Sequence, residues 1–291
     1  MSSNADIAEQ VGRESARRAR LAVPSLASGV LYLLSAIIIS SILREAPTVG
    51  VLQGLEPALK GAASSAESPR AAEVKFESHH AFGLIAASVL AAIAIVFLLM
   101  VLLFLLDATR FRRPQTNRSA HPLILFGGVL FAVLTIGNEV LLSIRRHNFA
   151  SGHDFSIHAV NAITHNSAYD VLAIVTPLAV IALVVGMIIT VTNSVRVGLL
   201  PRWMGVLGGV SAVLLLLPAP TLTLIPAFWL VSMGILLMGR WPKGDPPAWS
   251  AGQARPWPSP ADQRAARPQA AVPEPAMPPV GGSRKRRKRN R

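Results

Sequence analysis

Long apolar runs separated by short polar segments form the dominant pattern along this chain. A helix rises about 1.5 Å per residue, so roughly 20 apolar residues are needed to cross a hydrocarbon core of about 30 Å. Four runs reach this length, at 21–43, 81–106, 122–144 and 171–195. Each of them is predicted to be a transmembrane helix. The first run exceeds the apolar core of a signal peptide and is interpreted as an uncleaved anchor.

A fifth apolar region, 203–238, is too long for a single span, because one helix of that length would measure about 54 Å. Pro218 and Pro220 lie near its middle. Each proline lacks a backbone donor and disfavours helix in the residue before it. The pattern therefore predicts a tight hairpin of two spans, at about 201–218 and 221–239.

The distribution of arginine and lysine predicts the orientation of the spans. Four segments hold 22 of the 28 basic residues: 1–20, 107–121, 196–202 and 240–291. The segments that alternate with them hold six. Because basic residues favour the cytoplasmic side, six spans with both termini in the cytoplasm fit this bias.

The predicted fold class is therefore all-α: a polytopic bundle of six transmembrane helices over residues 21–239, following a cytoplasmic N-terminal segment. Composition supports this class, since 52% of the residues are hydrophobic and 15% are charged, against about 25% charged in soluble domains. The many arginines and alanines suggest a bacterial protein, which places the bundle in the inner (plasma) membrane. Because the chain has no cysteine, disulfides, thiol catalysis and cysteine-ligated metal centres are excluded.

Residues 240–291 are predicted to be a disordered tail, because they hold 11 of the 22 prolines and end in a basic cluster. The tail carries nine of the 13 net positive charges. Its favoured partner is anionic membrane lipid, at about 1 kcal/mol per basic residue near the surface. An acidic protein partner or RNA is the alternative, although no aromatic residues alternate with the charges, so no specific nucleic-acid binding is predicted. The contact residues would be Arg284, Lys285, Arg286, Arg287, Lys288, Arg289 and Arg291.

Glu139 is the ionisable residue that lies well inside an apolar run. Its predicted position is about five residues, or about 8 Å, below the outer end of the third helix. A carboxylate at this depth either bonds within the bundle or forms part of a polar pathway. The outer ends of three helices are expected to gather around it a polar cluster, which would act as a salt-bridged cap: Asn138, Glu139, Arg145, Arg146, His80, His165 and Asp170.

Histidines recur in the loop that follows the third helix. Their spacing matches no compact metal-ligand pattern, so no metal and no cofactor are predicted. His153, His158 and His165 remain weak metal candidates. A hydrated polar loop is the favoured interpretation, and pH sensing or metal binding are the alternatives.

Two further features concern packing and chemistry. Gly205 and Gly209 form a small-xxx-small pair, which favours close helix contacts within the bundle or in a homo-oligomer. Phosphate-binding loops, nucleophile elbows and inverted repeats are missing from the sequence, so neither an enzyme nor a known class of transporter is indicated.

The second half of the chain carries recognisable motifs: RVGLLPRWMG from Arg196, and GRWPKGDPPAW from Gly239. With the basic end, they resemble a family of uncharacterised six-span integral membrane proteins from actinobacteria and their relatives. The resemblance is specific over 196–249, implies the six-span layout, and supplies no activity or catalytic residue.

The sequence supports three functional hypotheses. The favoured one is a non-enzymatic membrane protein, structural or interaction-mediating, whose basic tail contacts anionic lipid or a partner. The first alternative is a small transporter or ion-conducting bundle with an outer polar vestibule around Glu139. The second alternative is a metal-dependent membrane enzyme that uses the histidines of the outer loop.

Overall fold

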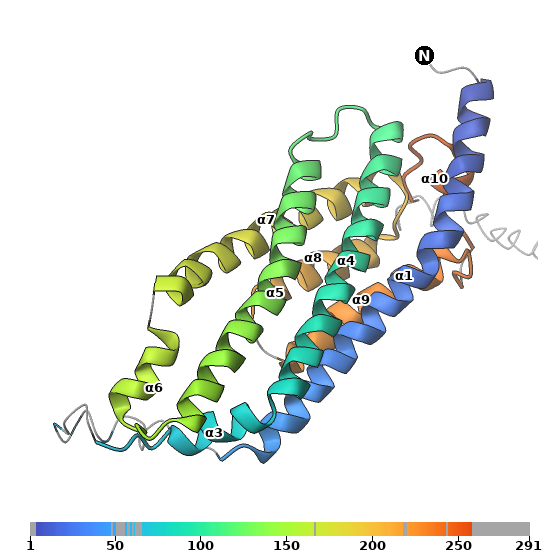
Figure 1. The fold of residues 1–291 in the computed structure, drawn as a ribbon. Helices are drawn as coiled ribbons and strands as arrows, with labels where there is room; N and C mark the ends of the chain where they lie inside the picture. The colour runs from blue at the N-terminus through green and yellow to red at the C-terminus, as the bar shows by residue number, and fades with distance from the viewer. Residues whose placement is uncertain are drawn as a thin grey trace, which may run out of the picture. The chain divides into compact units, whose positions relative to one another are not determined.

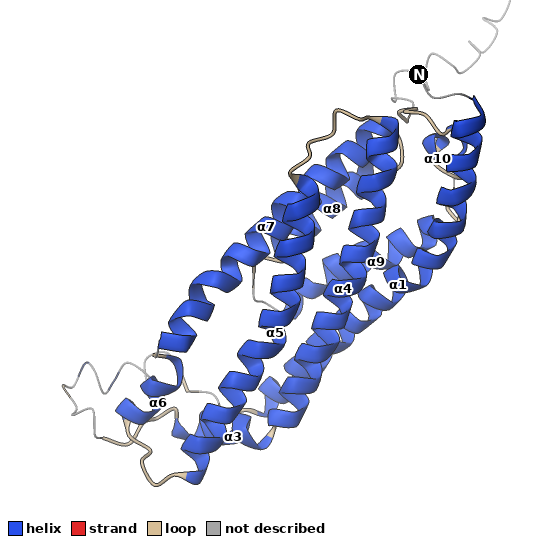
Figure 2. Cartoon of the chain, turned by 45° about the horizontal axis from the view of Figure 1, so that its top comes forward, coloured by secondary structure: helices blue, strands red, loops and turns tan. Residues whose placement is uncertain are grey.

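Four long helices dominate the computed structural model: α1 (Asn4–Glu45), α4 (Ala81–Arg112), α5 (Ala120–Ser151) and α7 (Ser167–Val197) (Figure 1). All four are long and apolar enough to cross a membrane. No strand occurs among the residues that the structure describes, which are 4–257 apart from 48, 51–55, 57–58, 60, 62–65, 166, 218–219 and 243. The predicted all-α class is therefore confirmed for these residues, and the four long apolar helices support the prediction of a membrane protein (Figure 2). Residues 1–256 form one compact unit and 257–291 a second, and the described helices all belong to the first unit.

Helix α1 begins far ahead of the predicted first span. The helix starts at Asn4, and the predicted span 21–43 occupies its second half. Its first turns are rich in alanine, arginine and glutamate, which have high helix propensity. The segment before the span is therefore a continuation of the helix that is available for packing.

Two shorter apolar helices complete the bundle. Helix α8 (Arg202–Leu214) has 13 residues, and helix α9 (Leu224–Leu237), preceded by the 3₁₀ turn η1 (Pro220–Thr223), has 14. They pair as a hairpin, with Trp229 Nε1 of α9 donating to the Met204 carbonyl of α8 at 3.1 Å. Each helix is only about 20 Å long, against a hydrocarbon core of about 30 Å. The predicted hairpin is present, but its length falls short of two full spans.

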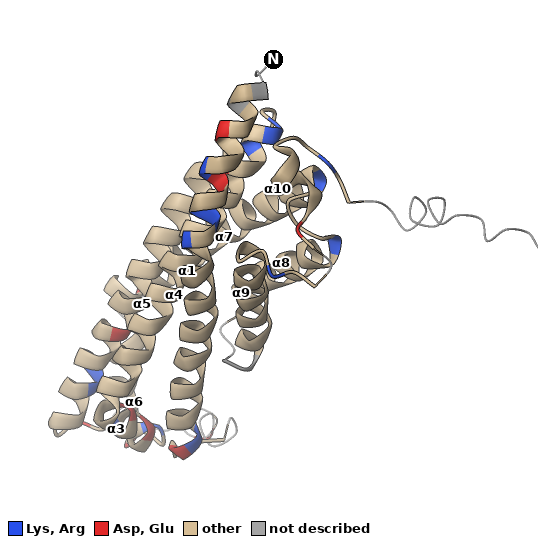
Figure 3. Cartoon of the chain, turned by 90° about the vertical axis from the view of Figure 1, so that its right-hand side faces the viewer, with Lys and Arg blue, Asp and Glu red and all other residues tan. Residues whose placement is uncertain are grey.

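The packing of α9 against α1 shows where the hairpin ends. The two helices run antiparallel, with Ser25 Oγ donating to the Leu230 carbonyl at 2.8 Å. A Cβ on Gly29 would lie 2.7 Å from the Ala227 carbonyl oxygen, so this closest approach requires glycine. Extending that register places Thr223, at the tip, beside about residue 33 of α1. Helix α1 continues for about 12 residues, or about 18 Å, beyond this level (Figure 3).

The end of the bundle beyond the hairpin is covered by two short helices, α3 (Ala71–His79) and α6 (Ile157–Thr164). We call it the cap end. Its small core contains Val74, Phe149 and Val160, and the segments before α3 and α6 meet in an isolated bridge between Glu67 and Ser156.

The opposite end, which we call the basic end, holds the start of α1, the loop 113–119, the turn 198–201 and the short helix α10 (Pro247–Ala251) (Figure 3). Helix α10 lies within the predicted disordered tail. Trp249 is 5% exposed and donates from Nε1 to the Leu199 carbonyl at 3.1 Å. The tail boundary predicted at residue 240 is therefore wrong, because one tryptophan anchors this proline-rich segment. Residues 258–291, with the predicted basic cluster, lie outside the described residues.

Candidate solute-binding cavity

A cavity of about 530 Å³ opens between the long helices beyond the tip of the α8–α9 hairpin. Leu217 and Thr223, at the tip, line its inner part, and Glu77 and Arg146 line the part nearer the cap end. Among the described helices, six pack together near the basic end, whereas only α1, α4, α5 and α7 continue past the hairpin tip, and the cavity results from this difference. The space that longer α8 and α9 helices would fill is left open.

The cavity wall combines apolar side chains with hydroxyl, amide and charged groups. Ser88 and Thr135 donate their hydroxyl protons to carbonyls of their own helices, to Ile85 and Phe131, both at 2.8 Å. The lone pairs of these oxygens are left to accept bonds from a ligand or water. The polar and charged lining residues are Tyr32, Ser35, Glu77, Ser88, Thr135, Asn138, Glu139, Arg146, Thr176 and Thr223.

Two carboxylates share one guanidinium in this wall. Arg146 Nη1 donates to Glu139 Oε1 at 2.7 Å, and Arg146 Nε lies 2.9 Å from Glu77 Oε2. The three side chains are between 13% and 19% exposed. Glu139 and Arg146 are seven residues apart on α5, so they lie on one face, while Glu77 comes from α3. With both carboxylates ionised, the three groups carry one net negative charge.

Burial raises the pKa of Glu77 above its ordinary value of 4.5. The neighbouring Arg146 lowers this pKa, but its effect is smaller than that of desolvation, and the carboxylates of Glu73 and Glu139 oppose it. One guanidinium therefore does not compensate the negative charge of this site. A further positive charge in the cavity would be stabilised there.

The predicted polar cluster forms only in part. Asn138, Glu139 and Arg146 line the cavity as expected. Arg145 points to the other side of α5 and donates to the Ala162 carbonyl at 3.2 Å, because successive residues of a helix are turned by about 100°.

Three other members of that prediction are placed elsewhere. His80 Nδ1 lies 2.9 Å from the Phe76 carbonyl oxygen, and its ring stacks on Phe76. His165 Nδ1 lies 3.1 Å from the Asn161 carbonyl oxygen. Asp170 is exposed and forms no ion pair among the described residues. The prediction of one cap joining all seven residues is therefore wrong for His80, His165 and Asp170, as it is for Arg145. Glu77, which the prediction missed, completes the charged group, because α3 folds back onto α5.

The histidines of the outer loop are exposed and dispersed. His153, His158 and His165 do not meet, and no group of three or more histidine, aspartate or glutamate side chains suited to a metal occurs within the described part of the chain. Asp154 instead accepts a bond from the Ser156 backbone at 2.9 Å, and this bonding to Ser156 lowers the pKa of Asp154. The geometry thus gives the metal-enzyme hypothesis no support.

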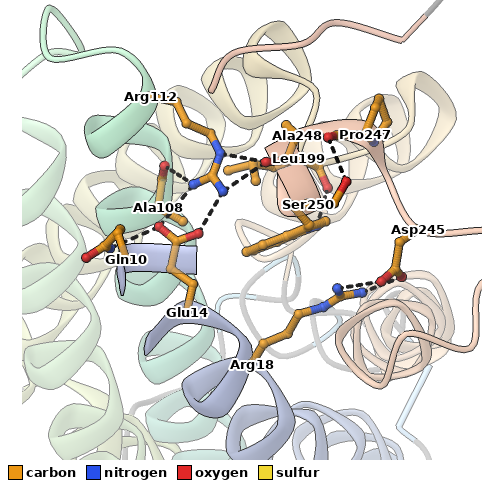
Figure 4. Close-up of polar contacts among 11 residues, drawn as sticks. Gln10, Glu14, Arg18, Ala108, Arg112, Leu199, Asp245, Pro247, Ala248 and Ser250 are labelled. Carbon is orange, nitrogen blue, oxygen red and sulfur yellow. Dashed lines mark hydrogen bonds and ion pairs between the residues drawn. The ribbon is translucent and has the colours of Figure 1, made fainter. Parts of the chain in front are cut away.

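A second polar cluster, buried at the basic end, joins the start of α1 to α4 and α10 (Figure 4). Arg112 of α4 is fully buried and contacts both carboxylate oxygens of Glu14, at 2.7 and 3.0 Å. The same guanidinium donates to the carbonyls of Ala248 and Ala108 at 2.9–3.0 Å. It also lies over the Trp249 ring, 5.6 Å from its centroid. We call this group the Arg112 clasp.

A neighbouring ion pair closes the same end. Arg18 of α1 contacts Asp245 at 2.7 and 2.9 Å and donates to the Leu236 carbonyl at the end of α9. Its guanidinium lies 5.0 Å from the centroid of the Trp249 ring. The sequence predicted Arg18 and Arg112 only as charges that mark the inner side. Their carboxylate partners lie about 230 and 100 residues away in the chain, respectively, so no local pattern pairs them.

Gly205 and Gly209, predicted to pack helices or copies of the chain, differ in their surroundings. A Cβ on Gly205 would clash with Val195 of α7 in the same chain, whereas one on Gly209 would meet nothing within 4 Å. The homo-oligomer stays a prediction, and only Gly209 leaves room for it.

Comparison with known proteins adds no relatives: no family model, no curated protein and no solved structure matches this chain. The resemblance of residues 196–249 to a six-span family therefore stays a prediction.

Proposed function

We propose that this chain is a multi-pass protein of the bacterial inner membrane that binds a small, partly apolar organic cation in its outer cavity, as the solute site of a small transporter. The observation that carries this proposal is the pair of carboxylates, Glu77 and Glu139, which share the single guanidinium of Arg146 in the cavity wall. The outer-vestibule alternative is thus preferred to a purely structural bundle. Contact of the basic tail with anionic lipid or an acidic partner stays an independent prediction.

Size and lining define the solute class. About 530 Å³ lies within the range of small-molecule sites, about 300–1,000 Å³. The negative charge of the wall favours a cation, since an ammonium group near Glu139 and Glu77 would relieve the repulsion between the two carboxylates. Apolar side chains such as Ile39, Leu84 and Phe131 favour an apolar body on that cation.

The proposed topology has four spans and a re-entrant α8–α9 hairpin that enters and leaves on the basic side. Because four spans and six spans are both even numbers, the termini stay on the same side in either case. The 22 basic residues of the alternating segments favour the cytoplasm for that side. The cavity then opens toward the cell exterior.

Single cysteines test this topology directly, because the natural chain has none. Thr223→Cys at the hairpin tip should react from outside with a small cationic thiosulfonate but not with a polyethylene-glycol maleimide too large for the cavity. Ser151→Cys, exposed at the end of α5, should react with both reagents. Equal reaction of Thr223→Cys with the large reagent would favour six full spans instead.

Solute binding is tested on the purified full-length protein with three probes of one shape: phenylpropyl-trimethylammonium, phenylpropanol and phenylbutyrate. Calorimetry should detect the cation, and Glu139→Gln should weaken its binding by about tenfold, the effect of losing one charge-assisted contact of about 1.5 kcal/mol. Glu73→Gln is the matched control, because Glu73 lies on α3 but pairs with Arg70 outside the cavity. Equal binding of all three probes, or equal effects of the two variants, would refute the cation site.

A further inference from the structure

A second hollow lies at the basic end, between the last turn of α4 and the first turn of α5. Its volume is about 610 Å³. Three of its seven lining residues are basic and none is acidic: Arg110, Phe111, Pro114, Thr116, Arg118, His121 and Pro122. It shares no residue with the outer cavity or with the Arg112 clasp, and the proposed solute does not use it.

The positive charge of this hollow is not balanced by the carboxylates near it. Arg110 donates from Nη2 to the Arg118 carbonyl at 3.2 Å, while its Nε atom is buried and has no hydrogen-bond partner among the described residues. At the same end, Asp107 pairs with Arg17 at 3.8 Å, and Glu14 is held by Arg112. A buried donor left unpaired is costly, so an acceptor that reaches Arg110 would be stabilised.

The position of the hollow on α5 adds to this preference for an anion. His121 is the second residue of a 32-residue helix, whose N-terminal end carries partial positive charge. The N-cap residue, Ser119, makes no side-chain cap bond. Basic side chains at a helix N-terminus are repelled by the positive end of the helix dipole, whereas a bound anion would be attracted to both.

An apolar stripe leads away from the hollow along α5. Phe126 is 72% exposed, Val129 is 47% and Val133 is 60%. With Pro122 they are spaced by four, three and four residues, so they share one face of the helix. The stripe runs into the part of α5 that is long and apolar enough to cross a membrane, where exposed apolar side chains would face lipid tails.

We propose that this hollow binds the phosphate of an anionic phospholipid, with Arg110, Arg118 and His121 around the headgroup and an acyl chain along the stripe. The basic groups supply the recognition of the phosphate, and the stripe distinguishes a lipid from a free anion. Phosphate is well matched by arginine, whose planar guanidinium donates two parallel hydrogen bonds.

Native mass spectrometry of the full-length protein in detergent tests this site with phosphatidylglycerol and phosphatidylcholine of identical acyl chains. The double variant Arg110→Gln/Arg118→Gln should lower the affinity for phosphatidylglycerol by about 30-fold and leave phosphatidylcholine unchanged, from about 1 kcal/mol per basic residue. The control Arg113→Gln/Arg202→Gln removes equal charge at the same end outside the hollow. Both double variants keep the basic tail, so the contribution of the tail to lipid binding is the same in each.

Three outcomes would overturn the proposal. An equal loss in the control variant would show general surface attraction. Binding of glycerol 3-phosphate or inorganic phosphate as tight as that of phosphatidylglycerol would show a free-phosphate site. Because Arg110 also holds the loop, the single variant Arg118→Gln is measured as well. The Arg118 side chain is exposed, so its replacement costs no packing. An unchanged affinity of this variant for phosphatidylglycerol would refute a headgroup site that includes Arg118.

Discussion

Replacing Arg112 by methionine tests whether the Arg112 clasp holds α1, α4 and α10 together. Methionine keeps an unbranched apolar stem and removes the guanidinium. The variant loses both contacts with Glu14 and the bonds to the Ala248 and Ala108 carbonyls. It leaves the Glu14 carboxylate 5% exposed, with Gln10 donating to it at 3.0 Å as its remaining side-chain partner.

The magnitude follows from that buried charge. Removing one partner of a buried ion pair costs about 3–5 kcal/mol, because the other charge is left without compensation. The loss of the cation–π contact with Trp249 is included in this range. The double variant Glu14→Leu/Arg112→Met removes both charges, and we expect it to lie within about 2 kcal/mol of the natural protein. The two substitutions should therefore be coupled by at least about 1 kcal/mol.

Equilibrium unfolding in mixed micelles with increasing dodecyl sulfate, followed by tryptophan fluorescence, measures these differences. Arg113→Met is the control, because Arg113 is the exposed neighbour and its loss should change stability by less than about 0.5 kcal/mol. The reasoning is refuted if Arg112→Met matches the control. It is also refuted if the double variant is no more stable than Arg112→Met.

Three further predictions concern other parts of the bundle. Gly127→Ala should destabilise the protein, since its Cβ would lie 2.7 Å from the Leu183 nitrogen. Gly137 has open space around it, so Gly137→Ala should stabilise α5 by up to about 1 kcal/mol, and the same unfolding assay compares the two variants. Ser156→Ala should cost about 1 kcal/mol and increase amide exchange in α6, because Ser156 Oγ accepts from the Ala159 nitrogen at the N-cap. Because burial raises the pKa of Glu77 in the folded state, the folded protein binds more protons than the unfolded chain between pH 4.5 and that raised value. Stability should therefore fall as pH rises through this window, and Glu77→Gln should abolish this contribution in unfolding curves measured against pH.

The long helices were predictable from the sequence because a membrane requires long apolar runs. The predicted starts at 81 and 122 lie within two residues of the first residues of α4 and α5. The start of α1 was missed, because its first turns, before the apolar run, are stabilised by packing against α4 and α10, which no local pattern reports. Trp249 shows the same limit: one side chain overrides a proline-rich composition when a fitted site exists on the bundle.

The charged sites were only partly predictable, because helix periodicity says which residues share a face but not which helix faces them. Glu139 and Arg146 could be placed on one face of α5, about two turns apart, from their spacing of seven residues alone. Glu77 could not, since it reaches Arg146 through a fold-back of α3 that depends on the small core at the cap end. The cavity itself depends on where the α8–α9 hairpin ends. Hydropathy shows that both helices are apolar, but it does not give the depth of the hairpin tip in the bundle.

The two ends of the bundle differ in a way that bears on the proposed transport. Below the outer cavity lies a void of about 20 Å³, large enough for about one water, which shares Tyr32 and Ile95 with the cavity and is bounded by Trp229. The proposed solute in the outer cavity would therefore meet a floor built from side chains of α1, α4, α7, α8 and α9. Separation of α9 from α1 would open one route to the basic side, and it would break the bond from Ser25 to Leu230 and the contacts of Arg18 with Leu236 and Asp245. The ion pairs at the basic end would then contribute to the free-energy barrier for opening, so weakening Arg18 should speed solute movement without weakening solute binding at Glu139.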